Sequence, residues 1–533
     1  MKGNSVLPGG SLKSKPTWLN ASVRSFTSVF LLNAEVNSQE QQAMRGQRHP
    51  IPKVPTKIAG LDEVLEGGIP RGRTTVVSGG PGSGKTVLGL EFLCRGAMAG
   101  EPGVFITLEE RAEAIRLNAS AMGWDLPALE KAGKLAIIEA RLLGEEIVAG
   151  DFDIQGLLAI VGGHVKRIGA RHIVMDALDV LLRIYDDLKR ERNELCRLHD
   201  WLTDQGLTSV LSVKTRHDDH QESQYEFLDF MADCVIRLDH RVVGQVATRS
   251  LRVIKYRGSG FGTNEYPYVF GEHGIVLFPL TTAELTHQPL GVKVSTGLKG
   301  LDLMLDGGFR RASCILISGN SGTGKTTLAS TFAQAACQRG ERVLYLNFEE
   351  STEAMISGML SPGIDLRPSI HDKTLLVQTA TPESTGSDHH LNRVMETIAR
   401  FKPDHLILDA VSACVRMGSK QTAFDFMMRL VSVVKERGIT SILTNQISSG
   451  ISHSDEELSG IGFSSVVDAV VQLRYVETDE EIIRQVLIVK SRGSAHSNRR
   501  QLYAITDRGI EFPETPQPLP GRVGEARRKD GGK

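Results

Sequence analysis

Two glycine-rich segments of the chain have the residue types and spacing of a phosphate-binding loop. In this pattern the glycines let backbone N–H groups cradle phosphates, the lysine reaches the β- and γ-phosphates, and the last hydroxyl binds Mg²⁺. Each segment lies between an apolar strand pattern and a helical pattern, so the sequence predicts two sites for ATP and Mg²⁺. The segments are Gly79-Gly80-Pro81-Gly82-Ser83-Gly84-Lys85-Thr86 and Gly319-Asn320-Ser321-Gly322-Thr323-Gly324-Lys325-Thr326.

An aspartate ends an apolar run in each half of the chain. Asp176 follows Ile173-Val174-Met175, and Asp409 follows Leu406-Ile407-Leu408. The carboxyl ends of parallel strands form the edge at which α/β sheets bind ligands. We therefore expect Asp176 and Asp409 to hold the metal ion, together with the hydroxyls of Thr86 and Thr326. The alternative is an aspartate that only caps a helix or a turn.

Paired glutamates follow a second predicted strand in each half. They are Glu109-Glu110 and Glu349-Glu350. A carboxylate near the γ-phosphate can accept the proton of an attacking hydroxyl or water, so these pairs are candidate catalytic bases. Two adjacent acids can also be exposed surface charges, but both halves keep the pair, which favours the catalytic interpretation.

A Lys-x-Arg-Gly-Ser pattern recurs late in each half, with Lys255 and Arg257 in the first copy and Lys490 and Arg492 in the second. These cations are far in sequence from the loop of their own half. We expect a neighbouring subunit to use them on its phosphates, as arginine fingers do. That role needs a head-to-tail ring. A solvated strand edge is the alternative.

The chain is an internal repeat. Gly60-Leu61-Asp62 recurs at Gly300-Leu301-Asp302, and the loops at 79 and 319 keep the same offset of 240 residues. Matched blocks in one order indicate duplication of a whole domain. Short apolar runs alternate with helical patterns, which predicts an α/β fold of two tandem RecA-like P-loop domains, each a mostly parallel sheet flanked by helices. The predicted division is a disordered leader at 1–47, with Met44 as a second candidate start, domains at 48–288 and 289–512, and a disordered tail at 513–533.

Composition narrows the function class. The 62 basic and 63 acidic residues leave a formal net charge of −1, which argues against broad binding to nucleic acid. The six cysteines contain no C-x-x-C pair, so a structural zinc site is not expected, and their sparse use fits a cytoplasmic protein. No apolar run approaches the roughly 20 residues of a membrane-spanning helix.

The order of these blocks resembles the KaiC family, the ATPase and autokinase of circadian clocks, from about Val54 to Phe512. The resemblance implies a homo-oligomer, a hexamer of two stacked rings with ATP between subunits. It also implies slow ATPase activity in the first domain and serine/threonine autophosphorylation in the second, which signals through its phosphorylation state. The family's acceptor pair, a Ser and a Thr before an aspartate, corresponds here to Ser464 and Ser465.

The repeat gives an independent check on these acceptors. The run that begins at Asp468 aligns with the run that begins at Asp233, which places Asp229 and Phe230 opposite the two serines. The first copy has no hydroxyl there, so phosphorylation is expected only in the second domain. The alternative is that the serines merely terminate a helix.

The resemblance also assigns roles to the glutamates and to partners. Glu349 is the expected base for the acceptor hydroxyl, with Glu350 in support, and Glu109 and Glu110 are expected to position water. The family's clock members carry a longer C-terminal segment that binds KaiA. The segment after Pro513 is unlike it, so KaiA regulation is not expected, whereas binding of a KaiB-like protein stays open.

Two other functions fit a P-loop protein. One is a RecA- or RadA-like DNA-handling ATPase, which the neutral charge and the missing four-cysteine module argue against. The other is a ring scaffold that ATP holds together without kinase activity, which the two glutamate pairs argue against.

Overall fold

A computed structural model of the chain describes residues 51–140, 154–185, 187–215, 226–243, 246–279, 288–447, 465–477 and 481–513. The leader predicted at 1–47, nearly all of the predicted tail and the candidate acceptor Ser464 lie outside these residues.

The first domain has a mixed sheet that is parallel around the phosphate-binding loop. In its described residues, six neighbouring strands run parallel and three further strands continue the sheet as antiparallel hairpins. The order across the sheet is β11 (Gly274–Leu277), β10 (Glu265–Gly271), β9 (Val246–Tyr256), β8 (Cys234–Val243), β3 (Thr74–Gly79), β7 (Thr208–Lys214), β6 (His172–Asp176), β4 (Gly103–Thr107) and β5 (Leu135–Glu139).

The second domain repeats this order strand for strand. Its described residues again give six parallel strands and three antiparallel ones, which confirms the predicted mostly parallel sheets. The order is β22 (Gly509–Glu511), β21 (Gln501–Thr506), β20 (Ile482–Ser491), β19 (Ala469–Glu477), β14 (Cys314–Gly319), β18 (Thr440–Gln446), β17 (His405–Asp409), β15 (Val343–Asn347) and β16 (Leu375–Thr379). A short two-stranded ladder precedes each large sheet, with β1 (Lys53–Val54) and β2 (Ile69–Pro70) in the first domain and β12 (Lys293–Val294) and β13 (Phe309–Arg310) in the second.

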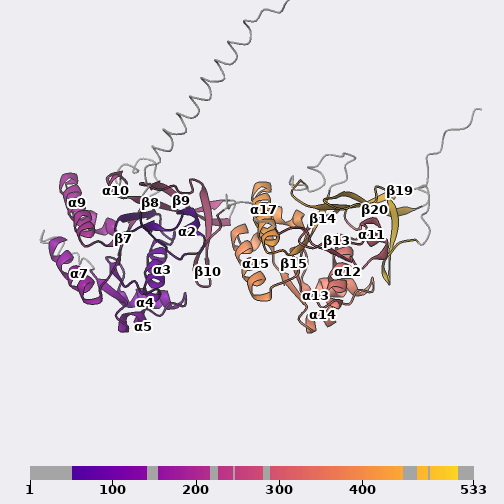
Figure 1. Ribbon diagram of the computed structural model, residues 1–533, viewed down its shortest axis with the longest axis horizontal. Coiled ribbons are helices and arrows are strands. Elements are labelled where there is room, and N and C mark those ends of the chain that lie inside the picture. The colour runs from indigo at the N-terminus through magenta and orange to yellow at the C-terminus, as the bar shows by residue number, and fades with distance from the viewer. Residues whose placement is uncertain are drawn as a thin grey trace, which may run out of the picture. The chain divides into compact units, whose positions relative to one another are not determined.

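Helices flank both sheets (Figure 1). The first domain has α2 (Leu61–Val64), α3 (Lys85–Met98), α4 (Ala112–Ser120), α5 (Leu126–Lys131), α7 (Ile154–Ile168), α8 (Leu178–Leu182), α9 (Leu188–Asp204) and α10 (Glu226–Met231). The second has α11 (Lys299–Met304), α12 (Lys325–Gln338), α13 (Thr352–Leu360), α14 (Arg367–His371), α15 (Ser387–Phe401), α16 (Val411–Cys414) and α17 (Lys420–Glu436), with 3₁₀ turns η2 (Pro382–Ser384) and η3 (Val415–Met417).

The central strands are apolar throughout because helices pack on both faces of the sheet. Every residue of β3 is buried, and its adjacent residues Val76 and Val77 belong to two separate apolar clusters. One cluster includes residues of α3, α4 and α5, and the other includes residues of α7, α8 and α9. A strand that packs helices on both faces needs apolar residues throughout rather than in alternation.

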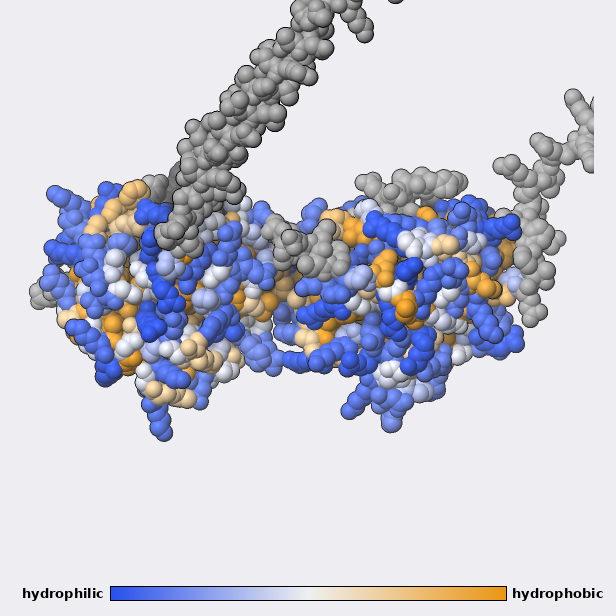
Figure 2. Space-filling model, in the orientation of Figure 1, coloured by the Kyte–Doolittle hydropathy of each residue, from blue (hydrophilic) through white to orange (hydrophobic). Residues whose placement is uncertain are grey.

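The outer surface is mainly hydrophilic on the face drawn in Figure 2. None of the helices that the structure describes has the length and apolar character of a bilayer-spanning segment.

A buried histidine begins one parallel strand in each domain. His172 starts β6 fully buried, with its Nε2 3.3 Å from a carboxylate oxygen of Glu101. Burial lowers the pKa of His172 to about 4, although the negative charge of Glu101 acts to raise it. His405 starts β17 with its Nε2 3.0 Å from Glu341, and burial lowers its pKa as well.

These histidines predict a loss of stability in acid. Because the folded-state pKa of His172 lies below the ordinary value of 6.5, the unfolded chain takes up the proton first. The stability that neutral His172 contributes is therefore complete above about pH 6.5 and is lost as the pH falls towards 4. We expect His172→Phe, which keeps a ring beside Phe92, to flatten the fall of the thermal midpoint across this range. His371→Phe, at a histidine with a 90 % exposed side chain, is the control that keeps the wild-type pH dependence. Equal pH dependence in both variants would contradict the assignment.

Candidate functional site

Each phosphate-binding loop joins the end of a central strand to the start of a helix. In the first domain, β3 ends at Gly79 and α3 begins at Lys85, with Gly84 in a left-handed conformation at φ 86°. A Cβ on Gly84 would lie 2.5 Å from the ring of Phe270. The backbone angle and the close approach both require glycine here. Gly324 occupies the same position in the second loop, at φ 91°.

The loop lysines rest on the carbonyls of their own loops. The ammonium of Lys85 donates to the carbonyls of Gly79 at 2.8 Å and Gly80 at 2.9 Å, and Lys325 donates to that of Asn320 at 2.8 Å. Burial lowers the pKa of both lysines, against the opposing charges of Asp176 and Asp409. A cation that is buried, as Lys85 is, or partly buried, as Lys325 is, beside a turn that precedes a helix N-terminus suits a phosphate chain.

The predicted metal-binding aspartates end their strands as expected. Asp176, only 8 % exposed, accepts a hydrogen bond from Thr86 Oγ1 at 2.6 Å and another from Ser212. The structure therefore brings together the two predicted ligands, a carboxylate and a hydroxyl, whose oxygens suit Mg²⁺. In the second domain the oxygens of Asp409 accept from Tyr345 at 2.9 Å and from Thr444.

The glutamate pairs follow β4 and β15 at the same sheet edge as the aspartates. In the first domain, Lys214 at the end of β7 donates to both carboxylate oxygens of Glu109. Burial raises the pKa of Glu110, with Asp176 the next cause. The Glu110 N–H donates to Thr107 Oγ1 at 3.1 Å, which fixes the backbone of the pair.

The second pair is held by backbone contacts and has a different charge environment. The N–H groups of Glu349 and Glu350 both donate to the Asn347 side chain, at 2.9 and 3.1 Å. Burial raises the pKa of Glu349, Asp409 raises it further, and Lys325 and Arg416 oppose the shift. A carboxylate with a raised pKa is better matched to accepting a proton near neutral pH.

The Lys-x-Arg pairs contact the segment that precedes the matched aspartates Asp233 and Asp468. Arg492 donates to the Ser465 carbonyl at 2.8 Å and Lys490 to the same oxygen at 3.4 Å. In the first domain, Lys255 donates to the carbonyls of Asp229 at 2.7 Å and Phe230 at 3.0 Å, and Arg257 also donates to that of Phe230. These cations thus position the segment that carries Ser465 in one domain and Phe230 in the other.

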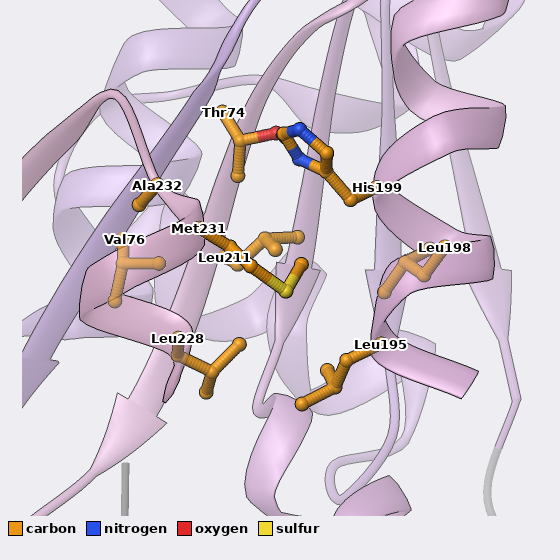
Figure 3. Close-up of a pocket in the computed structure, with 9 residues that line it drawn as sticks. All are labelled: Thr74, Val76, Leu195, Leu198, His199, Leu211, Leu228, Met231 and Ala232. Atoms are coloured by element: carbon orange, nitrogen blue, oxygen red, sulfur yellow. The ribbon is translucent and has the colours of Figure 1, made fainter. Parts of the chain in front are cut away.

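In the first domain that segment belongs to α10, which is anchored by apolar packing (Figure 3). The space that remains has a volume of about 10 Å³, which barely admits one water, so it is a packing gap rather than a ligand site. Phe230 points away from this core and is 70 % exposed. The lining residues are Thr74, Val76, Leu195, Leu198, His199, Leu211, Leu228, Met231 and Ala232.

Several polar partners of the site escaped the sequence analysis. Lys214, Ser212 and Thr444 lie on the strand next to the loop strand, and Tyr345 lies inside β15. The repeat offered one usable signal, because Lys214 and Gln446 end matching strands and differ in charge.

Comparison with known proteins agrees with the fold and the loops. The family described as "ATPase: KaiC" matches residues 54–282 and 294–517. The circadian clock protein KaiC2 of Synechocystis sp. is 37 % identical over 465 residues, which cover 87 % of this chain and 81 % of that protein. The circadian clock oscillator protein KaiC is 35 % identical in Thermostichus vulcanus, over 87 % of this chain and 89 % of the relative. The protein of the same name in Synechococcus elongatus is 34 % identical, over 90 % and 91 %. These matches do not favour a RecA- or RadA-like DNA-handling protein. With two copies of the domain and relatives above 30 % identity along most of its length, this chain belongs to the KaiC family of ATPases.

Proposed function

We propose that the first domain hydrolyses ATP and that the second phosphorylates its own Ser464 or Ser465, both with Mg²⁺. One observation carries the proposal. The two domains hold matching segments with the same Lys-x-Arg carbonyl contacts, yet the described acceptor position is the exposed Ser465 in one and Phe230 in the other. At this matched position, the second domain has a hydroxyl acceptor and the first has a phenylalanine.

The chemistry assigned to the second domain is an in-line phosphoryl transfer. Glu349 takes the proton of the serine hydroxyl while the serine oxygen bonds to the γ-phosphorus and the bond to the leaving ADP oxygen breaks. Lys325 binds the phosphates and Glu350 supports the base. Asp409 and Thr326 would hold Mg²⁺, which would supply charge neutralisation at the phosphates.

The first domain is assigned the same reaction with water as the acceptor. Glu109 and Glu110 orient the water and Lys85 binds the phosphates, while Thr86 and Asp176 would hold Mg²⁺. The product is free phosphate, because no serine or threonine stands at positions 229 and 230.

The assembly assigned to the chain is a hexameric ring that signals through its phosphorylation state. The three named relatives are circadian clock proteins, which supports a Kai-type partner such as a KaiB-like protein. In such a ring the guanidinium and ammonium groups of Lys255, Arg257, Lys490 and Arg492 would stabilise phosphate charge on the neighbouring subunit.

The direct test removes both acceptors. The Ser464→Ala/Ser465→Ala variant, incubated with Mg²⁺ and γ-labelled ATP, is expected to lose the protein-bound label while ATP hydrolysis continues. Ser361→Ala, at an exposed serine just after α13, is the control that keeps the label. Full labelling of the double variant would reject the two serines as acceptors.

A further inference from the structure

Lys214 is a second cation at the first nucleotide site. It ends β7, and its Cα pairs in parallel register with Gly79, the first residue of the phosphate-binding loop. Its N–H donates to the buried carboxylate of Asp179 at 3.1 Å, so its backbone is fixed. The charge of Lys214 is also felt at Lys85, whose pKa it lowers further after burial. Lys214 therefore lies where an added phosphate chain would attract it.

In the structure, Lys214 forms an ion pair with Glu109, a candidate catalytic residue of the first domain. Lys214 Nζ contacts both oxygens of Glu109, and the two side chains are 36 % and 37 % exposed. A carboxylate whose two oxygens are both engaged by an ammonium is poorly placed to accept a proton or orient water. The pair is also partly solvated, which keeps its strength modest and lets a more highly charged ligand compete for the ammonium.

The second site is built without this cation. Gln446 ends β18 and pairs with Gly319 in the register that Lys214 has with Gly79. An amide carries no charge with which to hold Glu349. The two sites thus share the loop, the aspartate and the glutamates. They differ in that an ammonium engages both oxygens of Glu109, whereas Arg416, the cation whose charge acts on Glu349 besides Lys325, donates to the Phe348 carbonyl.

We propose that Lys214 is a positioning residue that holds Glu109 until the γ-phosphate of ATP competes for its ammonium and releases the carboxylate for water activation. The inference rests on the proposed hydrolysis in the first domain. It makes release of the glutamate in the first site depend on the γ-phosphate, a dependence that Glu349 lacks because Gln446 stands at the matching strand end.

The test is a double-mutant cycle of Glu109→Gln and Lys214→Gln, in which the measured quantity is the affinity for nucleotide. ADP and a non-hydrolysable ATP analogue are titrated into the full chain carrying Lys325→Ala, which weakens the second site. Glu109→Gln removes the competitor for Lys214 and is expected to tighten the analogue two- to five-fold, with little change for ADP. Lys214→Gln is expected to reduce the preference for the analogue over ADP by roughly ten-fold.

The coupling between the two changes decides the outcome. In the Lys214→Gln background, Glu109→Gln is expected to have no further effect on the analogue, whereas Lys214→Arg should retain the wild-type preference. Additive effects, or an equal loss of affinity for ADP and the analogue, would overturn the proposal. Because no turnover is measured, a failure of the proposed hydrolysis would not affect this result.

A reciprocal change tests the same idea in the second domain. Gln446→Lys adds the ammonium beside Glu349. With Lys85→Ala to weaken the first site, it is expected to raise the preference of the second site for the ATP analogue over ADP, whereas Gln446→Leu, which adds no charge, should leave that preference unchanged. An unchanged preference in Gln446→Lys would show that a lysine at this strand end does not respond to the γ-phosphate.

Discussion

Replacing Lys325 by alanine is expected to slow phosphorylation of the second domain by about two to three orders of magnitude. Its ammonium, now resting on the Asn320 carbonyl, is the cation assigned to the phosphates of that site. Loss of one preorganised charge-stabilising donor costs about 3–4 kcal/mol of transition-state stabilisation, or roughly 10²–10³-fold in rate. The measurement is the initial rate of label transfer from γ-labelled ATP to the chain.

The matched control for this prediction is Lys420→Ala, at an exposed lysine that begins α17. It removes the same charge from the same domain at a position away from the loop, and the rate should stay within two-fold of wild type, as for ordinary surface substitutions. A Lys325→Ala protein that still transfers phosphate at the wild-type rate would rule out the second loop as the source of the γ-phosphate.

The Glu349→Gln variant is expected to bind ATP but to lose phosphoryl transfer by roughly 10²–10⁴-fold, the contribution typical of a general base. Glutamine keeps the size and the backbone contact to Asn347 but cannot accept the serine proton. Glu109→Gln is the matched change in the first domain. It should lower ATP hydrolysis and leave labelling of the second domain intact. If either single variant lost both ATP hydrolysis in the first domain and labelling of the second, the proposed division of labour between the domains would be wrong.

The pH dependence of labelling follows from the same carboxylate. Burial and Asp409 raise the pKa of Glu349 above its ordinary value of 4.5, so protonation begins at a higher pH than for an exposed glutamate. Only the ionised form accepts a proton, so the rate should fall as the pH drops through this raised pKa. The low rate that remains in Glu349→Gln should not show this fall.

The parts of the site that could be predicted from the sequence are contiguous in the chain. A glycine-rich loop, an aspartate that ends an apolar run and a glutamate pair after a strand each depend on local pattern. The second copy, which repeats these motifs in the same order, made chance matches implausible. The fold class also followed, because uninterrupted apolar runs indicate a sheet covered on both faces, whereas the order of the strands was not predicted.

The contacts that escaped prediction depend on the folded sheet. Lys214 and Glu109 are 105 residues apart, and they meet because β7, β6 and β4 are neighbours at one edge. Tyr345 donates to Asp409 because β15 lies beside β17, while the matching residue of the first domain is Phe105. Residue types alone give no sign of such pairings, since each of these side chains is unremarkable in its own segment.

The division of labour between the domains is tested most directly by mapping phosphorylated residues by mass spectrometry after the full chain is incubated with Mg²⁺ and ATP. We predict phosphate on Ser464 or Ser465, none in the first domain, and loss of the signal in Glu349→Gln. A chain that hydrolyses ATP yet carries no phosphate on either serine would contradict the autokinase assignment and leave two ATPase domains.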